Sequence, residues 1–130
     1  MPHRSRVCAV LIDCPESRIE PAVQFWSEAL GRPVIAKTNP DSPYTNLGTP
    51  EGSELDIFFQ AIKSQESRLH FDIETDDVEA EVHRLERLGA RRKRHVENYL
   101  WIMEAPSGHI FCVVPVQSKV WPTGAIEWPE

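Results

Sequence analysis

The sequence predicts an α+β protein built from two tandem βαβββ modules, at about residues 6–62 and 67–116. Strand-like and helix-like segments follow one another in the same order in both halves of the chain. The length of 130 residues suits one domain, so we expect residues 1–130 to fold as a single domain. Hydrophobic residues make up 41% and charged residues 26%, a composition typical of globular proteins with a packed core.

The first module opens with an apolar, β-branched strand over residues 7–13, which ends near Pro15 because proline cannot donate to a strand ladder. A helix follows, with Pro21 in its first turn and Gly31 at its C-terminal cap. Its apolar residues recur at helical spacing: Ala22, Phe25, Trp26, Ala29 and Leu30. Turns then separate three strands, at residues 34–37, 44–47 and 55–60.

The second module begins with a strand over residues 69–74 that alternates between apolar and polar side chains. A helix follows, capped by Asp76, with Glu79 completing a capping box and Gly89 at its end. Its apolar stripe contains Val78, Val82, Leu85 and Leu88. Three strands complete the module, at residues 90–93, 99–104 and 110–115. We expect a C-terminal tail, residues 117–130, to wrap the surface.

Short matches between the two halves indicate an internal repeat. Residues 29–31 (Ala-Leu-Gly) match residues 87–89 (Arg-Leu-Gly), and residues 49–52 (Thr-Pro-Glu-Gly) match residues 105–108 (Ala-Pro-Ser-Gly). The opening strands then align Ala9 with His70, and the closing strands align Asp56 with Cys112.

These segments resemble the vicinal oxygen chelate superfamily, which includes glyoxalase I, bleomycin-resistance proteins and extradiol dioxygenases. The resemblance spans nearly the whole chain. It is carried by residues 25–31, by the strand at residues 69–72, by the helix end at residues 88–90, and by residues 105–112. It implies that the paired modules curl into a cup around a small-molecule site, with helices on the outer face.

The resemblance also implies where a metal would bind, because metal-dependent members take ligands from the first and last strands of each module. Those positions hold Ala9, Asp56, His70 and Cys112 here. Alanine cannot act as a ligand, and Cys112 replaces an oxygen ligand with sulfur. We therefore expect no tightly bound catalytic metal and no other cofactor. If a metal does bind, the expected ligands are His70, Asp56 and Cys112, and the sulfur favours zinc.

Strand alternation predicts which side chains line the cup, since residues two apart share a face of a sheet. We expect the catalytic group to be His70 and the substrate-binding residues to be Asp56, Phe58, Asp72, Trp101 and Cys112. For His70, three interpretations stay open. It is a structural histidine bonded to a carboxylate such as Asp56 or Asp72, a substrate-binding or acid–base residue, or a metal ligand.

Other candidate residues have plainer interpretations. Trp101 either stacks on a ligand or belongs to the core. The acidic strand residues Asp13, Asp72 and Glu74 fit a solvated rim better than a carboxylate cluster. We expect both His83 and the basic cluster at residues 91–94 to lie on the surface. Trp121 and Trp128 either attach the tail to the body or enter a partner subunit.

Composition limits the partners. The net charge of −6 argues against nucleic acid, and no apolar run is long enough for a membrane span. Cys8, Cys14 and Cys112 form no paired framework, which suggests a cytoplasmic protein. We expect a homodimer that binds a small organic molecule. It would be a glyoxalase-like lyase, isomerase or dioxygenase-type enzyme, or alternatively a non-catalytic binding protein of the drug-resistance type.

Overall fold

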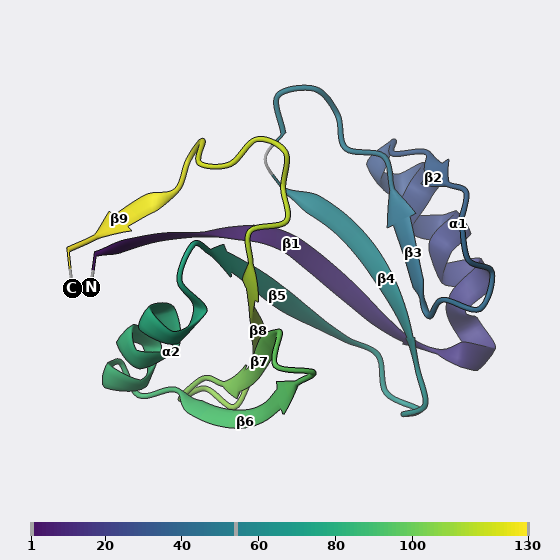
Figure 1. Cartoon of the computed structure of the whole chain (residues 1–130). Coiled ribbons are helices and arrows are strands. Elements are labelled where there is room, and N and C mark those ends of the chain that lie inside the picture. The colour runs from purple at the N-terminus through teal and green to yellow at the C-terminus, as the bar shows by residue number, and fades with distance from the viewer. Residues whose placement is uncertain (1, 54, 130) are drawn as a thin grey trace. The chain divides into compact units, whose positions relative to one another are not determined.

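The computed structural model describes residues 2–53 and 55–129, and in that part of the chain it contains nine strands and two α-helices. This mixed composition confirms the predicted α+β class, and Figure 1 shows the elements in chain order. Their bounds are β1 (His3–Pro15), α1 (Ile19–Leu30), β2 (Val34–Ile35), β3 (Tyr44–Leu47), β4 (Asp56–Ile62), β5 (Arg68–Thr75), α2 (Val78–Arg87), β6 (Arg91–Val96), β7 (Leu100–Glu104), β8 (Ile110–Pro115) and β9 (Ile126–Trp128).

The chain divides into two compact units. The first-repeat unit is Ala9–Leu69, and the second-repeat unit is Met1–Cys8 together with His70–Glu130. These bounds lie near those of the two predicted modules, except that the tail and the start of β1 join the second unit. Each unit contains one α-helix, in keeping with the predicted repeat.

In the first-repeat unit the strands follow the order β2-β3-β4-β1. The ladder between β1 and β4 is parallel and sets Ala9 opposite Asp56, whereas the other ladders are antiparallel. Helix α1 contacts β4, whose Phe59 is fully buried. Gly31 ends the helix as predicted: at a φ of +68° it takes the left-handed conformation that glycine adopts without steric cost.

The apolar face of α1 is less buried than its spacing suggests. No residue of α1 is buried, and the side chains of Phe25 and Leu30 are 59% and 43% exposed. Amphipathic spacing identifies a helix and its apolar face, but it does not fix how much of that face the same unit covers.

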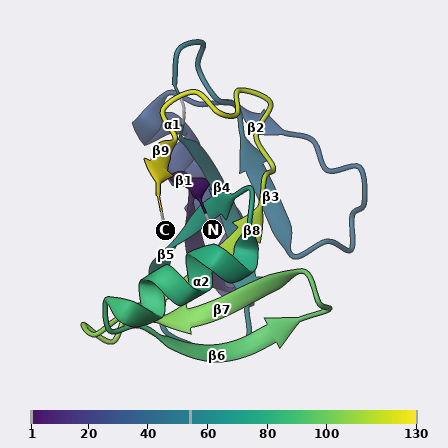
Figure 2. The same ribbon diagram turned by 60° about the vertical axis from the view of Figure 1, so that its left-hand side comes forward.

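In the second-repeat unit the strand order is β5-β8-β7-β6, and β9 pairs with the first residues of β1. Helix α2 lies along β6 and β7 (Figure 2). Beneath it lies an apolar core of Val82, Met103, Phe111 and Val113, with Ile73 packed against it. The predicted stripe residue Val82 is therefore confirmed as core. Leu88, also assigned to the stripe, is 67% exposed and lies beyond the helix end.

The N-terminal cap of α2 is one residue later than predicted. Asp77, not Asp76, is the capping residue, and its carboxylate accepts a hydrogen bond from the Ala80 amide at 3.0 Å. Glu79 makes no capping box, because a cap at Asp77 puts Ala80 rather than Glu79 at the third helical position. The Glu79 carboxylate binds the Arg92 guanidinium at 2.9 Å. Asp76 instead accepts a hydrogen bond from the Arg4 amide.

The expectation of a solvated acidic rim is wrong for Asp13 and Glu74, which are both fully buried. In the first-repeat unit Asp13 accepts a hydrogen bond from Arg68 at 2.9 Å, and in the second Glu74 accepts one from Arg6 at 2.7 Å. Buried carboxylates need such partners, because desolvation of an unpaired charge is costly. The two residues are thus structural.

The C-terminal tail is attached to its own unit. Trp128 of β9 donates a hydrogen bond from Nε1 to Ser5 Oγ at 2.8 Å, and the Arg84 guanidinium lies 3.7 Å from its ring centroid. Glu74 accepts hydrogen bonds from Ser118 and from the Gln117 amide. For Trp128, the structure supports attachment of the tail to the body.

The surface predictions for His83 and for most of the basic cluster are confirmed. The His83 side chain is 62% exposed, and Arg91, Lys93 and Arg94 are exposed. Arg92 is half-buried and binds Glu79 and Glu86. None of the described helices is both long and apolar enough to cross a membrane.

Candidate functional site

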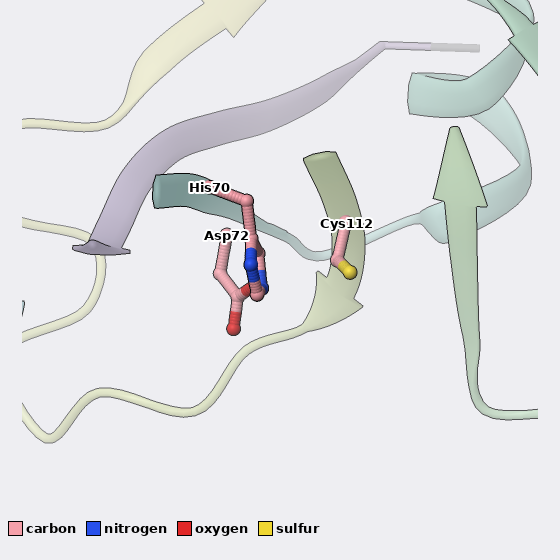
Figure 3. A group of neighbouring side chains, drawn as sticks. All are labelled: His70, Asp72 and Cys112. Atoms are coloured by element: carbon pink, nitrogen blue, oxygen red, sulfur yellow. The ribbon is translucent and has the colours of Figure 1, made fainter. Parts of the chain in front are cut away.

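Three side chains that could act chemically meet on one face of the second-repeat unit: His70, Asp72 and Cys112. His70 and Asp72 share a face of β5 because they are two residues apart. The parallel ladder between β5 and β8 sets Cys112 opposite Asp72, so the thiol joins that face. Figure 3 shows the imidazole and the carboxylate side by side on β5, with Cys112 on β8.

The cluster is compact and mostly shielded from solvent. One donor atom from each residue lies within 4.8 Å of the others, and His70 Nε2 is 3.7 Å from Asp72 Oδ1. The side chains of His70 and Asp72 are 8% and 13% exposed, and Cys112 is half-buried. The backbone carbonyl of Asp72 accepts a weak hydrogen bond from Cys8 Sγ at 3.5 Å.

This arrangement supports two kinds of chemistry. A carboxylate beside an imidazole is an arrangement found in acid–base sites, where one side chain positions the proton-transferring group. Nitrogen, oxygen and sulfur donors at this spacing also form the kind of set that zinc accepts. The structure brings together three of the six predicted site residues.

Asp56 and Phe58 lie on β4, in the first-repeat unit. The Asp56 carboxylate accepts a hydrogen bond from Thr49 Oγ1 at 2.5 Å, and the residue lies opposite Ala9. Phe58 is half-buried and lies opposite Leu11. Their roles in binding stay predictions.

Trp101 belongs to the opposite face of its sheet. Register sets it opposite Val113, a core residue under α2, whereas its neighbour Ile102 lies opposite Cys112. Its ring stacks on His95 with the centroids 4.3 Å apart, and the Arg92 guanidinium lies 4.8 Å from its centroid. The structure therefore supports the core interpretation of Trp101 and does not bring it to the His70 cluster.

The carboxylate beside His70 and Cys112 is Asp72, whereas the repeat alignment offered Asp56 as the acidic ligand. In the first-repeat unit Ala9 lies opposite Asp56, but in the second Asp72, not His70, lies opposite Cys112. Under the alignment of Ala9 with His70 and of Asp56 with Cys112, the strand registers of the two repeats therefore differ by two residues. Strand alternation alone, which places Asp72 on the face of His70, was the signal that identified this pair.

Comparison with known proteins identifies the class. The family model described as "Glyoxalase-like domain" matches residues 9–114, which is most of the chain. The chain therefore belongs to the glyoxalase-like family, as the resemblance of its repeated segments implied. A search of curated proteins finds no match.

Solved structures share the fold at low identity. Methylmalonyl-CoA epimerase from Mycobacterium tuberculosis is 16% identical with a TM-score of 0.57, over 87% of this chain and 89% of that one. A glyoxalase/bleomycin resistance protein/dioxygenase superfamily member from Vibrio splendidus is 20% identical with a TM-score of 0.57, over 86% and 99%. Homoprotocatechuate 2,3-dioxygenase from Arthrobacter globiformis is 15% identical with a TM-score of 0.58, over 87% and 36%. These similarities show the fold.

Proposed function

We propose that this protein binds a small organic molecule at the His70–Asp72–Cys112 cluster and that His70 donates or accepts a proton there. The observation that carries the proposal is the pair itself. An imidazole nitrogen and a carboxylate oxygen lie 3.7 Å apart, and both side chains are largely shielded from solvent. A few convergent polar groups are typical of small-molecule sites.

The class of reaction follows from the groups present. An imidazole beside a carboxylate suits abstraction or return of a proton next to a carbonyl, the kind of step that isomerases and lyases use. The low-identity neighbours include an epimerase and a dioxygenase, so the fold accommodates more than one chemistry.

A non-catalytic binding protein is the second candidate. The observation that favours it is Ala9, which is 1% exposed and supplies no functional group opposite Asp56. Binding requires shape and a few hydrogen bonds, whereas catalysis requires a complete set of reacting groups. Turnover of a ligand, once found, distinguishes the two candidates.

A thermal-denaturation screen of metabolites and small aromatic compounds tests the proposal. A ligand that binds only the folded protein adds about 2.7 kcal/mol of stability at 100 times its dissociation constant, which is easily measured. Stabilisation by a true ligand of this site should shrink in His70→Ala. It should persist in His83→Ala, because the His83 side chain is 62% exposed on α2. Equal stabilisation of wild type and His70→Ala by every hit would refute the proposal.

The same three residues, His70, Asp72 and Cys112, could together hold a metal ion. Tetrahedral zinc at bond lengths of about 2.0–2.3 Å sets its ligand atoms about 3.3–3.8 Å apart. The three donor atoms lie within 4.8 Å of one another, so the side chains would have to move closer together to hold the ion. A zinc ion there would polarise a carbonyl oxygen of the bound molecule.

We nevertheless expect well below one equivalent of zinc, nickel, iron or manganese in protein purified without chelator. The reason is that Ala9 occupies one of the positions from which metal-dependent relatives take a ligand. Elemental analysis is the measurement. One equivalent of zinc that is lost in His70→Ala and kept in His83→Ala would contradict this expectation and make the cluster a metal centre.

A further inference from the structure

We propose that the molecule bound at the His70–Asp72–Cys112 cluster is an organic carboxylate and that Arg94 of β6 binds its carboxylate group. This role rests on the proposed function, because the cluster must bind a ligand before Arg94 can select the charge of that ligand. Arg94 is exposed on β6, the edge strand of the second-repeat unit, and β8 with its Cys112 lies two strands away. Arg94 and the cluster all belong to this one unit.

Strand register places Arg94 on the same face as the cluster. Asp72 lies opposite Cys112, and Cys112 lies opposite Ile102. Ile102 in turn lies opposite Arg94. Residues that lie directly opposite each other in neighbouring strands share a face of the sheet. The four side chains therefore form one row across β5, β8, β7 and β6.

An irregularity in β6 turns Arg94 toward this face. Arg92 lies opposite Met103, a core residue under α2, and in a regular strand Arg94 would share that covered face. The register instead shifts between Arg92 and Arg94, which moves Arg94 to the other face. Ring contacts agree with this shift, because His95 and Arg92, three residues apart, both lie against the ring of Trp101. Bulges that redirect one side chain are common beside active sites.

The positive charge of Arg94 has no counter-ion among the described residues, unlike the charges of its neighbours on β6. Arg91 and Lys93 both pair with Glu104. Arg92 pairs with two glutamates of α2. A guanidinium without a counter-ion favours a carboxylate, which it can hold through two parallel N–H···O hydrogen bonds. Arg94 thus offers a carboxylate-binding group on the face of the cluster.

The row also sets the length and the direction of the ligand. Neighbouring strands lie about 4.8 Å apart, so the backbones of Arg94 and Cys112, two strands apart, are separated by about 10 Å. Ile102 lies between them and gives an apolar surface for the middle of the ligand. Asp72 would repel a carboxylate next to His70, whereas Arg94 would attract it. The carboxylate therefore points toward β6 and the reacting end toward β5.

Two probes that differ in charge test the role of Arg94. 4-Acetylbenzoate and 4-acetylbenzamide share a ring and a ketone, but only the first is an anion. The chain has a net charge of −6, so an anion that binds better than its neutral isostere must find a local positive charge. In NMR titrations of the whole chain, 4-acetylbenzoate should shift the backbone amide signals of Arg94, Ile102 and Cys112.

Wild type should bind 4-acetylbenzoate about tenfold more tightly than 4-acetylbenzamide, because hydrogen bonds between two charged groups are the stronger kind. Arg94→Gln should lose this preference and bind the amide as wild type does, whereas Arg94→Lys should keep part of it. Arg87→Gln is the matched control and should keep the preference. Arg87 is exposed in the last turn of α2, and α2 packs on the opposite face of the sheet, over Met103.

Equal binding of the two probes by wild type, no binding of either at millimolar concentration, or an unchanged preference in Arg94→Gln would each overturn this role of Arg94. An equal loss of affinity for both probes in Arg94→Gln would also overturn it. His70→Ala should weaken both probes to the same degree. Undiminished binding of both probes in His70→Ala would contradict the proposed function, so the two proposals fail on different results. Thermal denaturation of each variant checks its folding.

Discussion

The Arg6 guanidinium donates a hydrogen bond to the Glu74 carboxylate across 2.7 Å, and the two side chains are 4% and 0% exposed. Arg6 also donates to Ser118 Oγ and to the Thr123 carbonyl. Glu74 accepts further hydrogen bonds from Ser118 and the Gln117 amide. One buried ion pair therefore links β1, β5 and the C-terminal tail within the second-repeat unit.

Glu74→Gln should destabilise the protein by about 3–5 kcal/mol, because it leaves the Arg6 charge buried without its counter-ion. Urea denaturation monitored by circular dichroism measures the change. Glu127→Gln is the control: Glu127 pairs with Arg4, the two side chains are 69% and 46% exposed, and such pairs contribute about 0–1 kcal/mol. Similar urea midpoints for the two variants would contradict the structural role of Glu74.

Acid should unfold the protein through Glu74 and Glu81, the glutamates that are buried among the described residues. Burial raises the pKa of Glu74, but hydrogen bonds from Ser118, Gln117 and Arg6 outweigh it and leave the pKa below its usual value of 4.5. Burial also raises the pKa of Glu81. Hydrogen bonds from Arg84 and His3 outweigh this effect, so the pKa of Glu81 is again below its usual value.

The sign of the pH effect follows from linkage. A carboxyl group whose pKa is lower in the folded protein stabilises it above the unfolded pKa, and this stability is lost as the pH falls through the folded pKa. Stability should therefore be retained down to about pH 4.5 and decline below it. Urea midpoints between pH 7 and pH 3 measure the decline. Glu74→Gln should show a shallower decline than wild type, and an identical slope would count against this account.

The sequence predicted the bounds of some strands well and missed part of another strand. The bounds of β3 and β8 agree with the predicted ranges 44–47 and 110–115. Turns bearing proline and glycine delimit β3, and a continuous apolar run marks β8. The start of β1 was missed. Its first residues include His3, Ser5 and Arg6, which are polar yet buried, so they break the apolar pattern.

Those buried polar residues are stabilised by partners far along the chain. His3 Nε2 lies 2.7 Å from Glu81 Oε1, 78 residues away, and Arg6 binds Glu74, 68 residues away. No local pattern reveals such pairs. The candidate site was partly predictable, because His70 and Asp72 are only two residues apart on one strand and alternation places them on the same face. The position of Cys112 opposite Asp72 was not predictable, because it depends on how β5 pairs with β8.

Trp128→Ala should destabilise the second-repeat unit by about 2 kcal/mol, the sum of about 1 kcal/mol for its hydrogen bond to Ser5 and about 1 kcal/mol for its contact with Arg84. Hydrogen exchange should also speed up at residues 3–5, which pair with β9. Val120→Ala is a control in the same tail, since Val120 is 46% exposed. Unchanged exchange at residues 3–5 would mean that β9 does not protect this end of β1.

The expected homodimer can be tested separately from tail attachment. Symmetric dimers are the commonest soluble oligomers, and sedimentation velocity at micromolar concentration should give about twice the chain mass of 14.9 kDa. Trp128 binds Ser5 of its own chain, so Trp128→Ala should lower the melting temperature and leave the sedimenting mass unchanged.

Truncation after Val116 would confound the test, because it also removes Ser118 and Thr123, which bind Arg6. A wild-type mass near 14.9 kDa would refute the dimer, whereas a dimeric wild type with monomeric Trp128→Ala would place the tail at the subunit interface.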